Sequence, residues 1–363
     1  GVGLERARIQ RIMCGIAGIF DTREQRPVDE ALLNRMNQVQ FHRGPDDGGM
    51  HIEPGVGLAH RRLSIIDLSN GHQPLFNEDH SVVVVFNGEI YNFPALTEEL
   101  LSAGHRFRTH CDTEVIVHAW EEWGEACVER FRGMFAFAIW DRNRRTLFLA
   151  RDRLGIKPLH YALLADGRLL FASEIKSLLE CEALPRRIDP CAVEDYFSYG
   201  YVPDPRSIFQ DVCKLEAGYT LTIRTGQQNI LPRQYWDVPF VSNGVQRAAD
   251  ACDGIIERLR EAVNIRLISE VPLGAFLSGG IDSSAVVALM AGLSEKPVST
   301  CSISFGDPAF NEAHYAAQVA EQFGTDHQVE SVDPHDYGLV DRLARLYDEP
   351  YADSSAMPTY RVC

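Results

Sequence analysis

The sequence predicts two domains, an α+β sandwich of two β-sheets between helical layers and then an α/β domain with a doubly wound parallel sheet. The chain has 363 residues, which is typical of two domains. Up to about Leu179, short apolar runs bounded by turns alternate with amphipathic helices, and this pattern favours sheets covered by helices. From Val271 the order becomes strand, glycine-rich loop and helix, the unit from which parallel sheets are built.

The first half contains four predicted strands and three predicted helices. Four consecutive valines in Ser81–Phe86 favour a buried strand, because β-branched side chains pack well on a pleated surface. Arg142–Arg145 predicts the hairpin turn between two further strands, and the acids in Cys111–Glu114 suit a helix N-terminus. The predicted strands are 81–86, 133–141, 146–150 and 169–172, and the predicted helices are 29–39, 94–103 and 113–123.

The remainder of the chain predicts a connector and the beginning of a second domain. The connector spans 191–245 and includes an extended segment at Tyr199–Pro205 and a turn at Gly226–Asn229. The second domain, 246–363, begins with a helix whose apolar residues recur at nearly 3.6 spacing. Three strands leave one edge of its sheet unpaired. The predicted helices are 247–267 and 285–293, and the predicted strands are 271–277, 298–305 and 327–332.

The composition excludes several classes of protein. The 35 basic and 51 acidic residues leave a net charge of −16, and no stretch forms a basic track for nucleic acid or anionic lipid. No apolar run is long enough to span a membrane, and residues 1–12 lack the apolar core of a signal peptide. Nine scattered cysteines without a CxxC pair indicate reduced thiols. We therefore expect a cytoplasmic protein that binds neither nucleic acid nor membrane.

Cys14 is the first candidate catalytic residue. Gly1 is not an initiator whereas Met13 suits one, so we expect 1–13 to be a leader or upstream extension and 14–190 to be the first domain. Removal of this extension would leave a thiol beside a free α-amine, a nucleophile with its own base that suits attack on a carboxamide. The other end stops where a helix would begin, so we expect the second domain to be truncated.

Polar residues gather at the ends of the predicted strands. Arg62 precedes an apolar stretch, Asn87 and Glu89 follow the valine strand, and Asp112 begins a helix. Taken singly, such residues are common in turns and caps. Together they supply an arginine fork for a carboxylate, acids for an ammonium group and donors for an oxyanion, which is what a glutamine site requires.

The segment Ser278–Ser284, with the sequence SGGIDSS, is a candidate anion-binding loop. Its paired glycines let backbone N–H groups approach an anion, the helix that follows adds partial positive charge, and serine hydroxyls supply more donors. No lysine follows the glycines, so the loop differs from the GxxxxGK(S/T) loop that grips a γ-phosphate.

Seven stretches, in this order and spacing, resemble the glutamine-hydrolysing asparagine synthetases, whose first half is an N-terminal-nucleophile amidotransferase domain. They are CGI at 14–16, HRGPD at 42–46, RLSI at 62–65, NGEIYN at 87–92, DTEVI at 112–116, GMFAF at 133–137 and RDRLGIKPL at 151–159. The resemblance implies that Cys14 is the nucleophile. It also implies that the side chain of Asn87 and the N–H of Gly88 form the oxyanion hole.

The same resemblance implies how glutamine is held. Arg62 would bind the glutamine carboxylate, and Ile65 would offer a backbone contact. Glu89 and Asp112 would bind its ammonium group. The turn Asn70–Pro74 resembles a mobile lid over the site.

The SGGIDSS loop resembles the pyrophosphate-binding loop of enzymes that cleave ATP to AMP and pyrophosphate. This resemblance implies ATP as a substrate and Mg²⁺ as its partner, with Asp282 as a candidate magnesium ligand or loop brace. Leu277 and Phe305 fall where the family contacts the adenosine, and Asp348–Pro350 and Asp353–Ser355 fall near the expected acceptor site. The residues implied to hold pyrophosphate are Ser278, Gly279, Gly280, Ser283 and Ser284.

The resemblance as a whole implies a glutamine-dependent asparagine synthetase without a prosthetic group. Ammonia released at Cys14 would displace AMP from an aspartyl-AMP made from ATP and aspartate. The alternatives are a related amidotransferase that acts on another carboxylate in envelope or secondary metabolism, a glutaminase-only fragment, and a non-catalytic module of the same fold. Retention of Cys14, Arg62, Asn87 and Asp112 argues against the last. SGGIDSS excludes amidotransferases of sugar phosphates or phosphoribosyl groups, and the resemblance allows a homodimer.

Overall fold

The computed structural model describes residues 13–67, 70–227, 230–240, 247–306, 311–332 and 337–362. The predicted leader lies outside these residues except for Met13. The chain forms two compact units, of which unit 1 comprises residues up to Val238 together with Tyr347–Ala352. Unit 2 comprises Pro239–Leu346 and the residues from Asp353 onward. No helix in the described part of the chain combines the length and the apolar character needed to cross a membrane.

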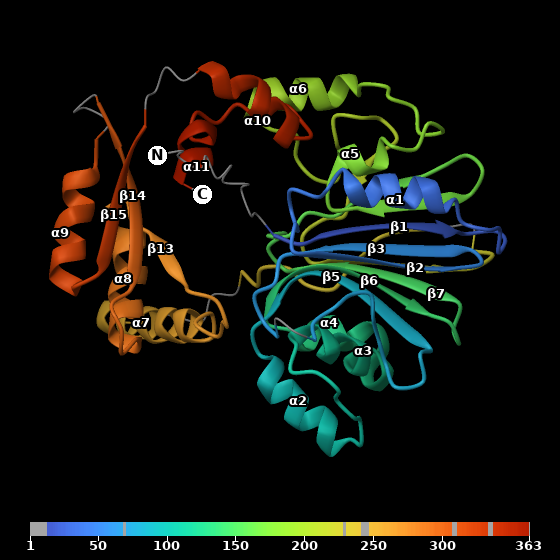
Figure 1. Cartoon of the computed structure of the whole chain (residues 1–363), viewed down its shortest axis with the longest axis horizontal. Helices are drawn as coiled ribbons and strands as arrows, with labels where there is room; N and C mark the ends of the chain where they lie inside the picture. The colour runs from blue at the N-terminus through green and yellow to red at the C-terminus, as the bar shows by residue number, and fades with distance from the viewer. Residues whose placement is uncertain are drawn as a thin grey trace, which may run out of the picture. The chain divides into compact units, whose positions relative to one another are not determined.

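Unit 1 contains two six-stranded antiparallel sheets, which lie one upon the other (Figure 1). The strand order is β10-β8-β9-β1-β3-β2 in the first sheet and β12-β11-β7-β6-β5-β4 in the second. The first sheet comprises β1 (Gly15–Asp21), β2 (Asp47–Glu53), β3 (Val56–Arg62), β8 (His160–Leu163), β9 (Arg168–Ala172) and β10 (Cys213–Lys214). The second comprises β4 (Leu75–Phe76), β5 (Val82–Ile90), β6 (Gly133–Asp141), β7 (Thr146–Arg151), β11 (Tyr219–Arg224) and β12 (Arg233–Gln234).

Helices cover the outer faces of both sheets, so unit 1 is the αββα sandwich that the sequence predicts (Figure 1). The first sheet is covered by α1 (Glu30–Gln38) and α5 (Ile175–Leu178). The second is covered by α2 (Phe93–Ser102), α3 (Asp112–Trp123) and α4 (Cys127–Arg130), with the 3₁₀ turn η1 (Gly124–Ala126) before α4. A further helix, α6 (Pro190–Tyr199), lies between β9 and β10 in sequence.

Strand β5 shows why the valine run folds as it does. Successive side chains of a strand point to opposite faces of the sheet. Val82 and Val84 therefore pack in the apolar layer beneath the helices, whereas Val83 and Val85 pack in the layer between the two sheets. Since both faces of β5 are buried, an unbroken run of β-branched residues satisfies both layers.

The predicted helices and strands of the first half are confirmed within a few residues, with one correction. The sequence places Asn87, Gly88 and Glu89 after the valine strand, but β5 continues through them to Ile90. These residues pair with β6, whose pairing with β5 continues to Gly133. The hydrogen-bonded ladder therefore extends beyond the apolar run. The described cysteines are free thiols, as their scattered positions predict.

The stretch 191–245 contributes more than a connector. Strands β10, β11 and β12 come from it and join both sheets of unit 1. Helix α6 ends at Gly200, whose left-handed φ of 81° closes it, so Tyr199 is helical and the extended segment begins after it. The hairpin turn expected at Gly226–Asn229 lies partly outside the described residues, but β11 and β12 on either side are paired.

Unit 2 has a three-stranded parallel sheet in the order β13-β14-β15, with α9 along one face (Figure 1). Its strands are β13 (Gly274–Phe276), β14 (Ser299–Phe305) and β15 (Asp326–Val332). Its helices are α7 (Ala248–Asn264), α8 (Ile281–Leu293), α9 (Ala313–Phe323), α10 (Val340–Leu346) and α11 (Ala356–Val362), with the 3₁₀ turn η2 (Tyr337–Leu339) before α10.

Two boundaries in unit 2 differ from the sequence prediction. The first strand is shorter than 271–277. Helix α8 begins at Ile281 rather than at 285, since Gly280 is an extended N-cap and its carbonyl accepts the N–H of Ser284 at 3.0 Å. Asp282 and Ser283 therefore belong to the first turn of α8, where backbone N–H groups lack partners within the helix.

Replacement of Phe137 by alanine should destabilise unit 1 by about 3–5 kcal/mol, because the ring is fully buried between the second sheet and its helices. Urea unfolding followed by tryptophan fluorescence measures this effect, and all four tryptophans lie in unit 1. Phe197→Ala is the control, because that ring is 81% exposed and its removal should change stability by no more than about 0.5 kcal/mol. Equal unfolding midpoints for the two variants would contradict the packing described.

Candidate active site

Cys14 lies directly before β1, beside the loop that follows β3. Antiparallel pairing sets Gly15 opposite Arg61, and this register brings the Cys14 side chain to Leu63. Sγ of Cys14 accepts the N–H of Leu63 at 3.3 Å and lies 3.6 Å from the Leu63 carbonyl oxygen. Burial raises the pKa of the thiol to about 11, so at neutral pH the thiol needs a base before it can act as a nucleophile.

A small cavity joins Cys14 to the residues expected to bind glutamine. Its volume is about 30 Å³, which suits one or two water molecules and not a glutamine. It is lined by Cys14, Arg62, Leu63, Ile65, Ile66, Gly71, Gln73, Phe86, Gly88, Glu89, Cys111, Asp112 and Thr113. The structure therefore brings together every glutamine-binding residue that the sequence predicts.

The turn Asn70–Pro74 closes this cavity by packing on Arg62. Nη2 of Arg62 donates to the carbonyl oxygens of Ile66 and Asp67 at 3.2 and 2.7 Å. A Cβ on Gly71 would lie only 2.2 Å from that same nitrogen, so glycine is required for this close approach. The turn thus lies directly on Arg62, and its expected role as a lid stays a prediction.

Asn87 is fully buried, and neither its side-chain oxygen nor its nitrogen has a hydrogen-bond partner among the described residues. Such unpaired buried amides are uncommon because each costs the free energy of a lost hydrogen bond. Its neighbours Phe86 and Gly88 line the cavity that holds Cys14. A Cβ on Gly88 would lie 2.2 Å from the Met134 carbonyl oxygen, so only glycine fits there. Asn87 itself is not among the residues that line the cavity, so its part in an oxyanion hole stays a prediction.

Glu89 and Asp112 form a buried pair of carboxyl groups. Burial and the charge of Asp112 raise the pKa of Glu89 well above its usual value. Burial also raises the pKa of Asp112. The N–H of Ile90 donates to its Oδ2 at 2.8 Å, and this hydrogen bond lowers the pKa by a smaller amount. Because two adjacent buried carboxylates repel each other, the pair retains a proton near neutral pH. An ammonium group bound there would replace that proton.

In unit 2 the SGGIDSS loop is held by its own hydroxyl groups. Oγ of Ser278 lies 3.0 Å from Oγ of Ser283 and accepts the N–H of Gly280 at 3.3 Å. Gly279 has a φ of 81°, and a Cβ there would lie 2.5 Å from Cβ of Tyr315, so glycine is required. Oγ of Ser284 is buried without a hydrogen-bond partner among the described residues.

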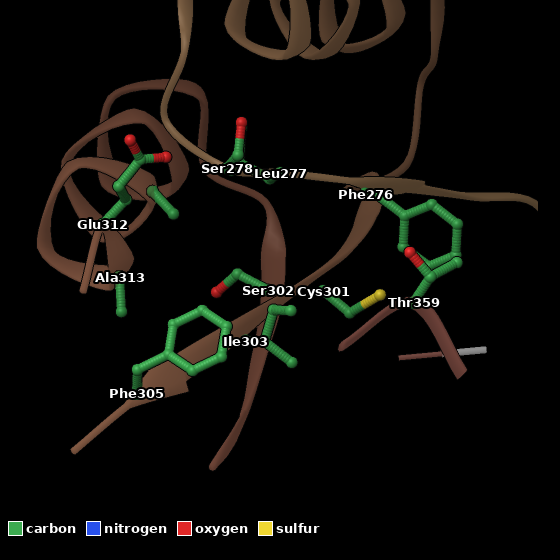
Figure 2. Close-up of a pocket in the computed structure, with 11 residues that line it drawn as sticks. Phe276, Leu277, Ser278, Cys301, Ser302, Ile303, Phe305, Glu312, Ala313 and Thr359 are labelled. Atoms are coloured by element: carbon green, nitrogen blue, oxygen red, sulfur yellow. The ribbon is translucent and has the colours of Figure 1, made fainter. Parts of the chain in front are cut away.

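A cavity of about 310 Å³ adjoins this loop, as Figure 2 shows. Leu277 and Phe305, the two residues expected to contact adenosine, line it together with Ser278. Its other lining residues are Phe276, Cys301, Ser302, Ile303, Glu312, Ala313, Ala316 and Thr359. The volume lies within the range of small-molecule sites, and the mostly apolar lining with a few polar groups suits a heteroaromatic ring.

Known proteins match both units. A glutamine amidotransferase domain matches residues 13–236, and asparagine synthase matches residues 254–363. A protein of Methanocaldococcus jannaschii, named putative glutamine-hydrolyzing asparagine synthetase 2, is 37% identical over 96% of this chain and 71% of its own length. This chain belongs to the glutamine-hydrolysing asparagine synthetase family.

Longer members of the family match as well. Glutamine-hydrolyzing asparagine synthetase 1 of Bacillus subtilis is 38% identical over 96% of this chain and 55% of its own length. The chain thus spans about half the length of that curated relative. Among solved structures, a glutamine phosphoribosylpyrophosphate amidotransferase from B. subtilis covers 87% of this chain and 65% of its own, with 16% identity and a TM-score of 0.44.

Lys157 is a site residue to which the sequence assigned no role, although it lies within a family stretch. It is almost fully buried, and burial lowers the pKa of its ammonium group to about 8, although the nearby Glu89 acts to raise it. The N–H of Lys157 donates to Oδ2 of Asp152 at 3.0 Å, and its Nζ contacts Sδ of Met13. A cation therefore lies beside the residue that precedes the nucleophile.

Arg43 and Glu174 form a second pair that the sequence analysis missed. Nε of Arg43 donates to the carbonyl oxygen of Cys14 at 2.9 Å, and its Nη1 donates to Oε1 of Glu174 at 3.1 Å. Nε2 of His42 lies 2.9 Å from the same carboxylate oxygen. Glu174 is an isolated acid in the sequence, so only its position beside the HRGPD stretch in the fold indicates its role.

Asp348 and Glu349, expected near the family's acceptor site, lie in unit 1 among the described residues. Oδ1 of Asp348 pairs with Nζ of Lys176 at 2.8 Å, and its Oδ2 accepts the N–H of Ile175 at 2.6 Å. Oε2 of Glu349 pairs with Nζ of Lys214 at 2.6 Å. Their part in binding an acceptor stays a prediction.

Replacement of Glu89 by glutamine should make unit 1 less sensitive to rising pH. A carboxyl group whose pKa is raised by folding binds more protons in the folded state, so its contribution to stability is lost as pH rises above about 4.3, the unfolded value. In thermal unfolding followed by tryptophan fluorescence, the midpoint of Glu89→Gln should therefore rise relative to that of the parent chain between pH 5 and pH 8. The exposed Glu98→Gln is the control, and a Glu89→Gln difference that is constant with pH would contradict the raised pKa.

Proposed function

We propose that this chain supplies the glutaminase reaction and the pyrophosphate-binding loop of a glutamine-dependent asparagine synthetase. The observation that carries the proposal is the convergence of Cys14, Gly88, Glu89 and Asp112 on one buried cavity. Membership of the family supports aspartate as the acceptor. The chain's relatives include an amidase of Penicillium rubens that is 35% identical over 86% of the chain, so another carboxylate is the alternative acceptor.

In the proposed glutaminase step, the α-amine of an N-terminal Cys14 takes the thiol proton as sulfur attacks the carboxamide carbon of glutamine. The oxyanion that forms accepts hydrogen bonds from the side-chain N–H of Asn87 and the N–H of Gly88. As this intermediate collapses, the α-ammonium returns its proton to the leaving nitrogen, which departs as ammonia and leaves a thioester. Water then hydrolyses the thioester to glutamate and regenerates the thiol. Arg62 holds the substrate carboxylate, and the carboxylates of Glu89 and Asp112 hold its ammonium group.

Two features of the structure support this assignment of roles. The amide of Asn87 has no internal partner, so an oxyanion would satisfy it without breaking an existing hydrogen bond. The buried thiol has a raised pKa and needs a base close to sulfur, and a free amine on the same residue supplies one. With Met13 attached, that nitrogen is an amide and accepts no proton.

In unit 2, ATP would place its adenine in the cavity lined by Leu277 and Phe305. Its β- and γ-phosphates would lie on the SGGIDSS loop. Asp282, exposed in the first turn of α8, offers one carboxylate for Mg²⁺, and magnesium sites commonly use one or two carboxylates together with substrate phosphates. The donor set therefore fits the metal, which would neutralise phosphate charge while the carboxylate acceptor is adenylated.

A chain that begins at Cys14 should release ammonia from glutamine, and Cys14→Ala should abolish this release. Loss of the sulfur removes the covalent route altogether. The surface variant Cys191→Ala, whose thiol is exposed, is the matched control and should retain activity. Ammonia release by Cys14→Ala at the parent rate, after subtraction of a no-enzyme blank, would overturn the assignment.

Retention of residues 1–13 should suppress the same activity, since the base is then an amide. The comparison needs two preparations whose N-termini are verified by intact mass, one that begins at Gly1 and one that begins at Cys14. Full activity in the preparation that retains Met13 would show that the α-amine is not required.

Replacement of Asn87 by alanine should lower kcat of the glutaminase reaction by about 10²–10³-fold with a smaller change in KM, as expected for a lost oxyanion donor. Asn34→Ala, on the exposed face of α1, is the control. A decrease confined to KM would place Asn87 in substrate binding instead.

A further inference from the structure

A group of histidine and glutamate side chains, outside the glutamine site, gathers on the helical face of unit 1. We name it the His–Glu cluster, and it consists of Glu78, His105, His118 and Glu121. Glu78 lies in the turn between β4 and β5, His105 follows α2, and the other two lie on α3. One ligand atom from each of Glu78, His105 and His118 lies within 4.8 Å of the others.

The inward atoms of the cluster lie at distances that suit a metal. Nδ1 of His118 is 3.1 Å from Oε2 of Glu121 and 3.7 Å from Oε2 of Glu78. Nδ1 of His105 is 3.7 Å from the same oxygen of Glu121. Ligands about 2.0–2.1 Å from a tetrahedral zinc ion lie about 3.4 Å from one another. Small side-chain shifts would thus place the ligand atoms of Glu78, His105 and His118 around one ion. Glu121 contacts both histidines and lies within reach as a fourth ligand.

The outward oxygen of each glutamate is held by a neighbour. Oε1 of Glu78 accepts the N–H of Arg106 at 2.9 Å. Oε1 of Glu121 accepts from Nδ2 of Asn77 at 2.7 Å. In both residues one oxygen is anchored while the other faces the histidines, which is how carboxylate ligands of metals are oriented.

The outward nitrogen of each histidine faces a further carboxylate. Nε2 of His118 lies 3.6 Å from Oε1 of Glu114, and Nε2 of His105 lies 3.4 Å from Oε2 of Glu122. A histidine that binds a metal usually directs its second ring nitrogen to a carboxylate or carbonyl, which sets the tautomer and strengthens the ligand. His105 makes this hydrogen bond, whereas Nε2 of His118 is buried near Glu114 without a hydrogen bond among the described residues.

We propose that the His–Glu cluster binds one divalent transition-metal ion, with Zn²⁺ as the best match. Two imidazoles and two carboxylates form a four-ligand nitrogen and oxygen set, which favours zinc over the oxygen-only sites of calcium or magnesium.

The bound ion links three segments that are distant in sequence. It joins the turn before β5 and the loop after α2 to the second half of α3. Asp112 begins α3, about 9 Å along the axis from His118 at 1.5 Å per residue. A metal at the cluster therefore stabilises the helix that carries one of the glutamine-site carboxylates, without contact with the reacting atoms.

Titration of the full 363-residue chain with ZnCl₂ in a calorimeter, after treatment with a chelator and dialysis, tests this proposal. One zinc per chain should bind at the cluster, and the thermal midpoint reported by tryptophan fluorescence should rise. His118→Gln and His105→Gln should each weaken this binding by more than about tenfold, the loss seen even when an outer partner of a ligand is removed. His51→Gln, a histidine beside Glu53 and outside the cluster, should bind zinc like the parent.

The free cysteines supply a competing explanation that the histidine variants distinguish. Zinc binding of unchanged affinity and stoichiometry in both cluster variants would assign the ion to thiols and overturn the proposal. Absence of saturable binding in the parent chain would show that the cluster is an internal ion-pair network only. If His118→Gln does not fold, the half-buried Glu121→Gln and His105→Gln give the same comparison.

Discussion

The active site depends on the apolar layer between the two sheets, where β1 and β5 lie back to back. Ile16 and Phe20 of β1 pack in the same layer as Val83 and Val85 of β5. This packing sets the start of β1 close to the end of β5, although the two segments are far apart in sequence. Strands therefore position the nucleophile and the unpaired amide of Asn87. The turn Asn70–Pro74 covers Arg62.

Burial determines the electrostatics of the glutamine site. It raises the pKa of Cys14 and Glu89 and lowers that of Lys157, so burial disfavours the charged form of each of these three groups. In the proposed function, a zwitterionic substrate would bring one positive group to the two carboxylates and one negative group to Arg62. Substrate binding and ionisation of the pocket are consequently coupled.

The sequence predicted the αββα sandwich and its main strands from apolar periodicity. Contiguous stretches also indicated residues that the fold brings to one cavity at Cys14, while their part in binding glutamine stays a prediction. It missed Glu174 and the His–Glu cluster, whose members are separated in sequence and meet only through tertiary packing. It also ended β5 too early at Asn87. Local polarity suggests a turn there, but the ladder with β6 continues and overrides that preference.

A chain of charges connects the nucleophile to the segment Tyr347–Ala352, which lies within the part of the sequence that matches asparagine synthase. Arg43 holds the Cys14 carbonyl oxygen and pairs with Glu174. Lys176 then bridges Glu174, at 2.9 Å, and Asp348, at 2.8 Å. Lys176 is partly exposed and lies between these two acids, so the position of Asp348 affects the charges around the groups that hold the backbone of Cys14.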